Sequence, residues 1–300
     1  MKTAWLWMIL LFVSVCQCGN AQVWLKTEYI GSSGFRDADN QKVGGKGDMK
    51  VIQGGVNIPL SMKMDENNHP TAWMVGVGAT YASMNNKNLA GYVDLKEIFN
   101  AQLAVSYIRP LNKKWSLLAS VGVGTFMDTP NLSYIRFNNL MGIGMAAAIW
   151  HLRENLDVGM GLALNTTFGY PMVFPAAFVD WRIEGRYMVN VSMMDGIELS
   201  GGIQLHKLMR LKLVASMGGM MALVEHGGKD QIFTQQYVVC GLQPELVLSK
   251  SFSIPLTVGV SAYRAAYYSD RTLKAFFKGD EYDPHFMPSF YASLALKYGF

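Results

Sequence analysis

Hydrophobic and polar residues alternate with a period of two along much of the chain. In one such run, residues 156–168, bulky apolar side chains occupy every second position except Thr166, and the positions between them are small or polar. The same pattern recurs at 73–81, 115–123 and 179–191. A period of two is that of a β-strand. Runs beyond ten residues are longer than an ordinary globular strand but suit a tilted strand that crosses a membrane.

The segments between these runs fall into two alternating classes. Short polar connections lie at 65–71, 109–114, 151–155 and 249–252, and longer ones, rich in Gly, Asn, Pro and charge, lie at 31–47, 85–97, 127–138, 169–177, 225–234 and 266–285. Outer-membrane barrels alternate short periplasmic turns with long outer loops in this way. Six long loops predict an all-β fold, a transmembrane antiparallel up-and-down β-barrel of about 12 strands.

Two segments depart from this regular plan. "IELSGGIQL" at 197–205 also alternates and would make a thirteenth strand. Single-chain bacterial barrels have even strand numbers, so we assign 192–208 to an elaborated periplasmic connection, either a strand pair or an irregular segment. Pro244, inside the expected strand 235–248, cannot donate a ladder hydrogen bond and predicts a bulge.

A soluble sandwich or barrel is the alternative, because its strands also alternate, with the apolar face inward and the polar face in water. Aromatic residues near the ends of the expected strands argue against it, since they fit two girdles at the membrane interfaces. They are Trp73, Tyr107, Trp115, Trp150, Phe168 and Tyr298.

The first 21 residues predict a secretory signal peptide. Lys2 precedes an apolar run at 4–15 that is too short to span a bilayer, and Gly19 and Ala21 suit cleavage after Ala21. Acylation of Cys16 or Cys18 is the alternative, disfavoured because neither cysteine follows a small residue. Residues 22–300 then form a single outer-membrane β-barrel domain.

The composition of this domain excludes further classes. Without Lys2 the formal charge falls from +4 to +3, too small to indicate nucleic acid as a partner. With the signal peptide removed, Cys240 is the last of the three cysteines, so we expect no internal disulfide.

The chain ends in "LALKYGF", residues 294–300, a strand pattern that stops on an aromatic residue. With the signal peptide and the repeated strands, this ending resembles outer-membrane β-barrel proteins of Gram-negative bacteria. The resemblance implies location in the cell outer membrane, contact with its lipid, and insertion by the barrel assembly machinery, with Tyr298 and Phe300 as the closing signal. The last strand would then close against the first near Val23, Leu25 and Tyr29. The stretch "PMVFPAAFVDWRIEGRYMVNV" with "IELSGGIQL" also resembles an uncharacterised barrel domain family without assigned activity.

The rows opposite the lipid-facing ones predict the lumen lining. In the expected strand 178–191, charges of alternating sign occupy every second position from Asp180 to Arg186, and further polar groups follow on the inward rows of the next strands. The predicted lumen-lining belt comprises Asp180, Arg182, Glu184, Arg186, Arg210, Lys212, Gln243 and Glu245. It is either a self-neutralising wall or a constriction that selects ions or polar solutes.

Small residues predict open space on the other strands. Their inward rows are expected to be Gly76, Gly78, Ser120, Gly122, Gly124, Gly142, Gly144, Ala146, Ala148, Gly159, Gly161 and Ala163. The G-x-G pairs among them lack the third glycine and the strand-to-helix context of a dinucleotide fingerprint.

Signals for chemistry are weak. The five histidines have no spacing that would face two together, so we expect no metal site and no cofactor. Strand register offers no Ser–His pair, so we expect no enzyme, and an outer-membrane hydrolase is the weakest alternative. The favoured function is a small channel or uptake barrel for polar solutes with a charged lumen belt. The alternative is a plugged structural or binding barrel that acts through its outer loops, above all 266–285.

Overall fold

The computed structural model describes residues 21–66, 69–136, 139–193, 197–272, 274–275 and 283–299. The signal peptide at 1–20 and Phe300 lie outside these residues. The strands are β1 (Gln22–Arg36), β2 (Lys42–Met64), β3 (Pro70–Lys87), β4 (Glu97–Asn112), β5 (Trp115–Met127), β6 (Leu140–Arg153), β7 (Leu156–Asn165), β8 (Met172–Ile183), β9 (Tyr187–Ser192), β10 (Ile197–His206), β11 (Met209–His226), β12 (Lys229–Ser249), β13 (Phe252–Asp270), β14 (His285–Phe286) and β15 (Ser289–Tyr298). A 3-10 turn, η1 (Leu132–Tyr134), lies between β5 and β6.

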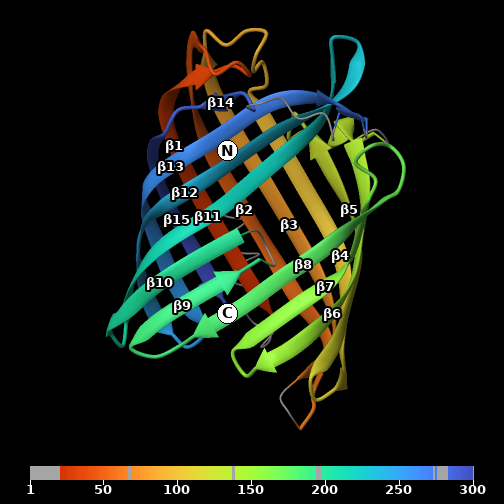
Figure 1. Ribbon diagram of the computed structural model, residues 1–300, viewed down its shortest axis with the longest axis vertical. Helices are drawn as coiled ribbons and strands as arrows, with labels where there is room; N and C mark the ends of the chain where they lie inside the picture. Colours follow the sequence, from red (N-terminus) through yellow and green to blue (C-terminus); the bar gives the residue numbers. More distant parts are fainter. Residues whose placement is uncertain are drawn as a thin grey trace.

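The strands form one antiparallel sheet that closes on itself (Figure 1). Each strand from β1 to β13 pairs with the next, and β15 pairs with both β13 and β1. Val23, Leu25 and Tyr29 face Tyr298, Leu296 and Ala292, as predicted for the closure. The two-residue β14 pairs with the same two neighbours as β15, so the two are one interrupted strand. The structure confirms the closed antiparallel barrel and gives it 14 strands, against a prediction of about 12.

The two additional strands come from the segment that interrupted the regular plan. The alternating run at 179–191 is divided by a turn at 184–186, where Gly185 has a φ of 147°, so β8 and β9 are separate strands. β10 pairs with both β9 and β11. The assignment of 192–208 to a periplasmic connection is therefore wrong. With both changes the strand number is even, and β1 begins at the end of the barrel where β15 finishes, which we call the terminal end. The opposite end is the loop end.

The bulge predicted at Pro244 is also absent from its strand. Pro244 pairs with Leu211 of β11, and the register of β12 against β13 is the same on both sides of it. The Gln243 side-chain amide donates to Thr257 Oγ1 at 2.9 Å, which joins β12 to β13 beside the proline. The register shifts of β12 against β13 lie instead between Val238 and Val239 and between Val247 and Ser249.

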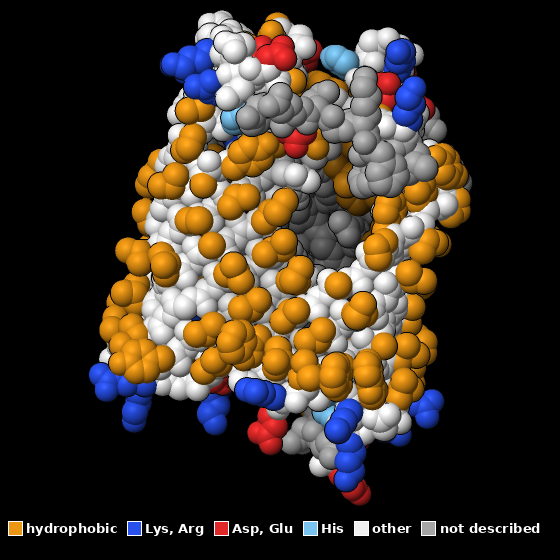
Figure 2. Space-filling model, in the orientation of Figure 1, with side chains coloured by type: hydrophobic (Ala, Val, Ile, Leu, Met, Phe, Trp, Pro, Cys, Tyr) orange, Lys and Arg blue, Asp and Glu red, His pale blue; other side chains and the backbone are white. Residues whose placement is uncertain are grey.

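The outer face of the barrel is apolar, which excludes the soluble alternative. Met160 and Val121 are 72% and 68% exposed on it, and apolar side chains cover the wall in Figure 2, with Lys and Arg gathered beneath them at the terminal end. Near that end Trp73 contacts Tyr107, and Trp115 stacks on Trp150. Phe168 does not belong to a girdle, because it is only 8% exposed in an interior cluster. The described part of the chain contains no helix with the length and apolar character to cross a membrane.

The loop-end half of the lumen is filled by an apolar core. Inner-face residues of β1 to β4, such as Ile30, Met49 and Ile98, pack against inner-face residues of β11 and β12, such as Met220 and Phe233. The lumen at this level is therefore closed by side chains of β1 to β4 and of the β11–β12 hairpin.

The loop-end part of the β11–β12 hairpin lies inside the barrel instead of in its wall. Its other face, with Leu223 and Ile232, packs against inward-facing Phe126 of β5, Met141 of β6 and Phe174 of β8. The Asn100 amide, oriented to donate, bonds to the Met221 carbonyl at 2.7 Å. Both faces of the hairpin are thus covered by the wall strands around it.

A buried carboxylate joins the walls beneath this core. Glu28 of β1 accepts hydrogen bonds from Tyr291 of β15, from Tyr237 of β12 at 3.0 Å and from Gln53 of β2 at 2.8 Å. Lys26 Nζ lies 2.8 Å from the same carboxylate. Four groups from four strands therefore share one anion. Nearer the loop end, buried Arg264 donates to the Gly47 carbonyl at 2.6 Å and stacks 3.7 Å above the Phe286 ring.

Glu28→Ala should lower the free energy of unfolding by about 3–5 kcal/mol, because it leaves a half-buried cation and two buried phenols without their shared acceptor. Glu28→Gln keeps one acceptor oxygen and should lose less. Urea titration of the barrel folded into liposomes measures both. Equal losses for the two variants would show that the shared acceptor is not what stabilises this level.

Candidate functional site in the barrel lumen

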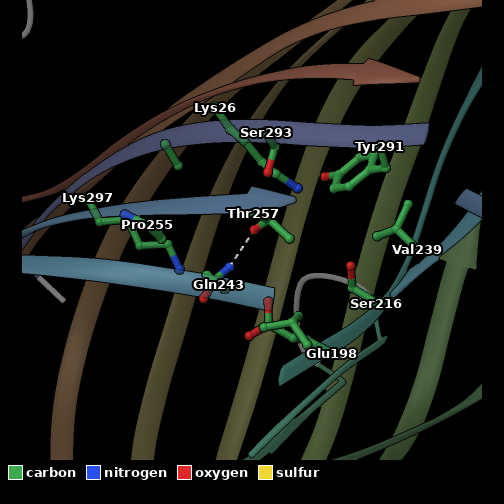
Figure 3. Close-up of a pocket in the computed structure, with 12 residues that line it drawn as sticks. Lys26, Glu198, Ser216, Val239, Gln243, Pro255, Thr257, Tyr291, Ser293 and Lys297 are labelled. Atoms are coloured by element: carbon green, nitrogen blue, oxygen red, sulfur yellow. Dashed lines mark hydrogen bonds between the residues drawn. The ribbon is translucent and has the colours of Figure 1, made fainter. Parts of the chain in front are cut away.

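The terminal half of the lumen contains a polar cavity of about 80 Å³. Figure 3 shows side chains from several strands converging on it, with Glu198, Ser216 and Gln243 opposite Tyr291 and Ser293. Its lining residues come from β1, β10, β11, β12, β13 and β15: Lys26, Glu198, Val214, Ser216, Val239, Gln243, Pro255, Thr257, Tyr291, Ser293, Ala295 and Lys297. The cavity therefore offers two cations, one carboxylate and several hydroxyl groups.

Three residues of the predicted belt meet next to this cavity. Glu245 of β12 lies 2.8 Å from Lys212 Nζ and 3.9 Å from Arg210, both of β11, and its side chain is 7% exposed. Register explains the contact, because Arg210 pairs with Glu245 and Lys212 with Gln243 across β11 and β12. These groups neutralise part of each other's charge.

The four belt residues expected on the strand 178–191 are arranged as predicted only in part. Asp180 and Arg182 share the inner face of β8 and form an ion pair at 3.2 Å. Glu184 and Arg186 lie in the exposed turn between β8 and β9, since the expected single strand ends at Ile183. The charges therefore form two separate groups, on β8 and on β11–β12, with β9 and β10 between them.

The inward row of β6 was assigned to the wrong face. Leu118 of β5 pairs with Ala147 and packs with Ile149, so odd-numbered residues of β6 face the lumen. Gly142, Gly144, Ala146 and Ala148 face outward. The bulky residues are inside here because they pack against the β11–β12 hairpin and against Phe178. For β3, β5 and β7 the pairing places the small residues on the lumen face as expected.

This change brings together three residues that the sequence analysis kept apart. Ser116 Oγ of β5 lies 2.7 Å from His151 Nε2 of β6, and His151 Nδ1 lies 2.7 Å from Asp157 Oδ1 of β7. His69, in the β2–β3 turn, stacks on the His151 ring at 3.9 Å. The expectation that no Ser–His pair lies within reach is therefore wrong. The signal was the turn "HLREN": its hairpin puts His151 opposite Asp157.

The described residues contain no group of three His, Cys, Asp or Glu side chains that could hold a metal ion.

Among the predicted closing residues, Tyr298 pairs with Val23 and with Phe252.

Comparison with known proteins places this architecture in a family. Residues 17–299 match the family described as "Domain of unknown function (DUF6268)". The chain belongs to this family. No curated protein matches the sequence.

Solved structures with a similar arrangement of strands are outer-membrane barrels. An outer membrane channel from Pseudomonas putida F1 is 11% identical with a TM-score of 0.45, covering 93% of this chain and 95% of that one. A FadL homologue from Pseudomonas aeruginosa is 11% identical, TM-score 0.43, covering 94% and 90%. The translocator domain of the autotransporter NalP from Neisseria meningitidis is 13% identical, TM-score 0.38, covering 94% and 88%. The likeness of this family member to them is one of fold alone.

Lys212→Met should lower the free energy of unfolding by about 2–3 kcal/mol, because it leaves the Glu245 carboxylate without its closest cation. Exchanging the pair, Lys212→Glu with Glu245→Lys, should recover most of the loss. Lys207→Met, in the exposed β10–β11 turn, is the control and should change stability by less than about 0.5 kcal/mol. Urea unfolding in liposomes measures all three, and a loss for Lys207→Met equal to that for Lys212→Met would contradict the ion-pair explanation.

Proposed function

We propose that the protein is an outer-membrane channel that passes small amphipathic solutes between an opening in the barrel wall and the terminal half of the lumen. On this proposal the terminal end faces the periplasm, after export by the N-terminal signal. The axial route to the cell surface is closed by the apolar core, so the route through the wall is the one that remains.

The observation that most supports this proposal is the interruption of the wall between β8 and β11. β8 pairs with β9 only over Asp180–Ile183, and β10 pairs with β11 only up to Met217. Beyond these points β8 and β11 both continue toward the loop end, and among the described residues no strand lies between them. Figure 2 shows a hollow in the apolar surface below the loops. Backbone groups left unpaired in lipid are costly, so a gap at this level calls for a reason.

The chemistry around the gap favours an amphipathic solute. β9, β10 and β11 form its rim on the terminal side and carry a groove of about 420 Å³ on their surface. The groove is lined by Val189, Asn190, Val191, Leu199, Ser200, Gly201, Leu213 and Ala215. The lumen beyond has the polar cavity and the Lys212–Glu245 pair. A molecule on this route would first contact the mainly apolar groove and then the polar lining of the lumen.

The packed core also supports a second function, a plugged barrel that acts through its outer loops. Arg271, after β13, donates to the carbonyls of Thr166 and Thr167 in the β7–β8 loop, which joins two loops across the mouth. A pocket of about 220 Å³ lies beside it, with Asp128, Arg136, Glu225 and Asp230 among its lining residues. A charged pocket at the loop end suits a polar ligand at the cell surface.

Flux through the barrel distinguishes the two functions. Proteoliposomes carrying the mature protein should take up NBD-aminohexanoate, a small amphipathic carboxylate, faster than empty liposomes, and should take up glucose much more slowly. Ala176→Trp, on the inner face of β8 at the gap, should reduce uptake several-fold because the indole fills the route. Ala177→Trp is the matched control, since that side chain points outward.

A wild-type protein that is folded, as heat-modifiable gel mobility reports, yet takes up neither solute would contradict the channel. If Phe233→Ala then made the liposomes leaky, the core would be identified as a plug, and the outer pocket would become the preferred site.

A further inference from the structure

Ser116, His151 and Asp157 lie on three consecutive strands at the terminal end of the lumen. Asp157 is directly opposite His151, and Ser116 pairs with Ile149, one inward position from His151. The order of contacts is that of a Ser–His–Asp catalytic triad, called the relay below. The carboxylate meets Nδ1 of the histidine, and Nε2 faces the serine hydroxyl. In such a relay the acid fixes the tautomer in which Nε2 can accept the serine proton.

We propose that these three residues hydrolyse carboxylic esters with an apolar acyl chain, an activity separate from the proposed channel. Ser116 Oγ would attack the ester carbonyl carbon and give its proton to His151 Nε2. The bond from that carbon to the alcohol oxygen breaks, and the alcohol leaves with the proton from His151. Water then attacks the acyl-serine, His151 takes the proton of the water and returns it to Ser116, and the carboxylic acid is released.

The surroundings of Ser116 indicate the acyl part of the substrate. An apolar cluster lines the inner wall on the loop-end side of the serine: Leu118, Ala147, Ile149 and Phe178, with Ile108 and Met145 packed against it. On the other side lie His151, Asp157 and the Asp180–Arg182 pair. The serine is thus at a boundary where an ester would place its acyl chain among apolar residues and its alcohol part among charges.

Access to the serine is controlled by what covers the relay. Ser116 is fully buried, so its hydroxyl reacts only when neighbouring groups move. His69 is the described group stacked on the His151 ring, and it belongs to a turn instead of a barrel strand. Removing the His69 ring should therefore increase the rate at which Ser116 reacts without touching the relay itself.

The test is labelling by an alkyl fluorophosphonate. Its phosphorus takes the place of the ester carbonyl carbon, and an activated serine oxygen bonds to that phosphorus and displaces fluoride. The mature protein, folded in detergent micelles, should be labelled at Ser116 as located by mass spectrometry, and should release 4-nitrophenol from 4-nitrophenyl butyrate. Ser116→Ala should abolish both signals. Asp157→Asn should slow labelling at least about 100-fold, because the wrong tautomer is then favoured, and His69→Ala should accelerate it several-fold.

Ser120→Ala is the matched control. Ser120 is an inward-facing serine of the same strand that is bonded to Ser106 and not to a histidine, so its loss should leave labelling unchanged. The proposal is overturned if folded wild type and folded His69→Ala both remain unlabelled, or if Ser116→Ala retains the label or the esterase activity. Solute uptake by Ser116→Ala should equal that of wild type, so loss of the ester chemistry and loss of the channel are told apart.

Discussion

The structure depends on one constraint, that a sheet in a membrane must pair its backbone groups with itself. No water is present in the hydrocarbon region to replace a missing partner, so the sheet has to close. Here it closes where β15 pairs with β1 from Tyr298 to Tyr291. Closure with both chain ends at one end requires an even number of strands. The turn at Gly185 supplies the missing reversal, because it divides one apparently continuous strand into β8 and β9 and so gives β10 a place in the wall.

The wall departs from this constraint between β8 and β11, and the rest of the interior follows from that departure. β11 is much longer than β10, so beyond Met217 it has no neighbour on the β10 side, whereas β12 stays paired with β13 up to Gln231. The loop-end part of the β11–β12 hairpin lies inside the barrel, where Asn100 bonds a β11 carbonyl and apolar side chains cover both faces of the hairpin. The free edge of β11 is thus protected by burial in the barrel interior instead of by pairing with another strand. The same arrangement fills the axis at the loop end and confines the polar part of the lumen to the terminal half.

The sequence predicted the barrel because a period of two repeats over most of the chain and does not depend on which strands meet. It predicted the face of each strand wherever the outward row is the bulky one. That rule failed for β6, whose bulky row faces a hairpin that enters the lumen, and no local pattern reports such a hairpin. Gly185 was the signal for the β8–β9 turn, but Asp180 to Arg186 alternates in charge across it and so imitated one strand.

The error at β6 also explains why the Ser116 contact was missed. Placing Gly142 inward turns His151 outward, and the relay then has no central member. A relay across three strands needs the register of two strand pairs and the correct face of all three, whereas the ion group at Glu245 needs only one pair. Contacts that join more strands are therefore harder to derive from sequence. Such contacts are also less expected by chance. An imidazole with a serine at one nitrogen and a carboxylate at the other requires three strands to agree in register at the same level of the wall.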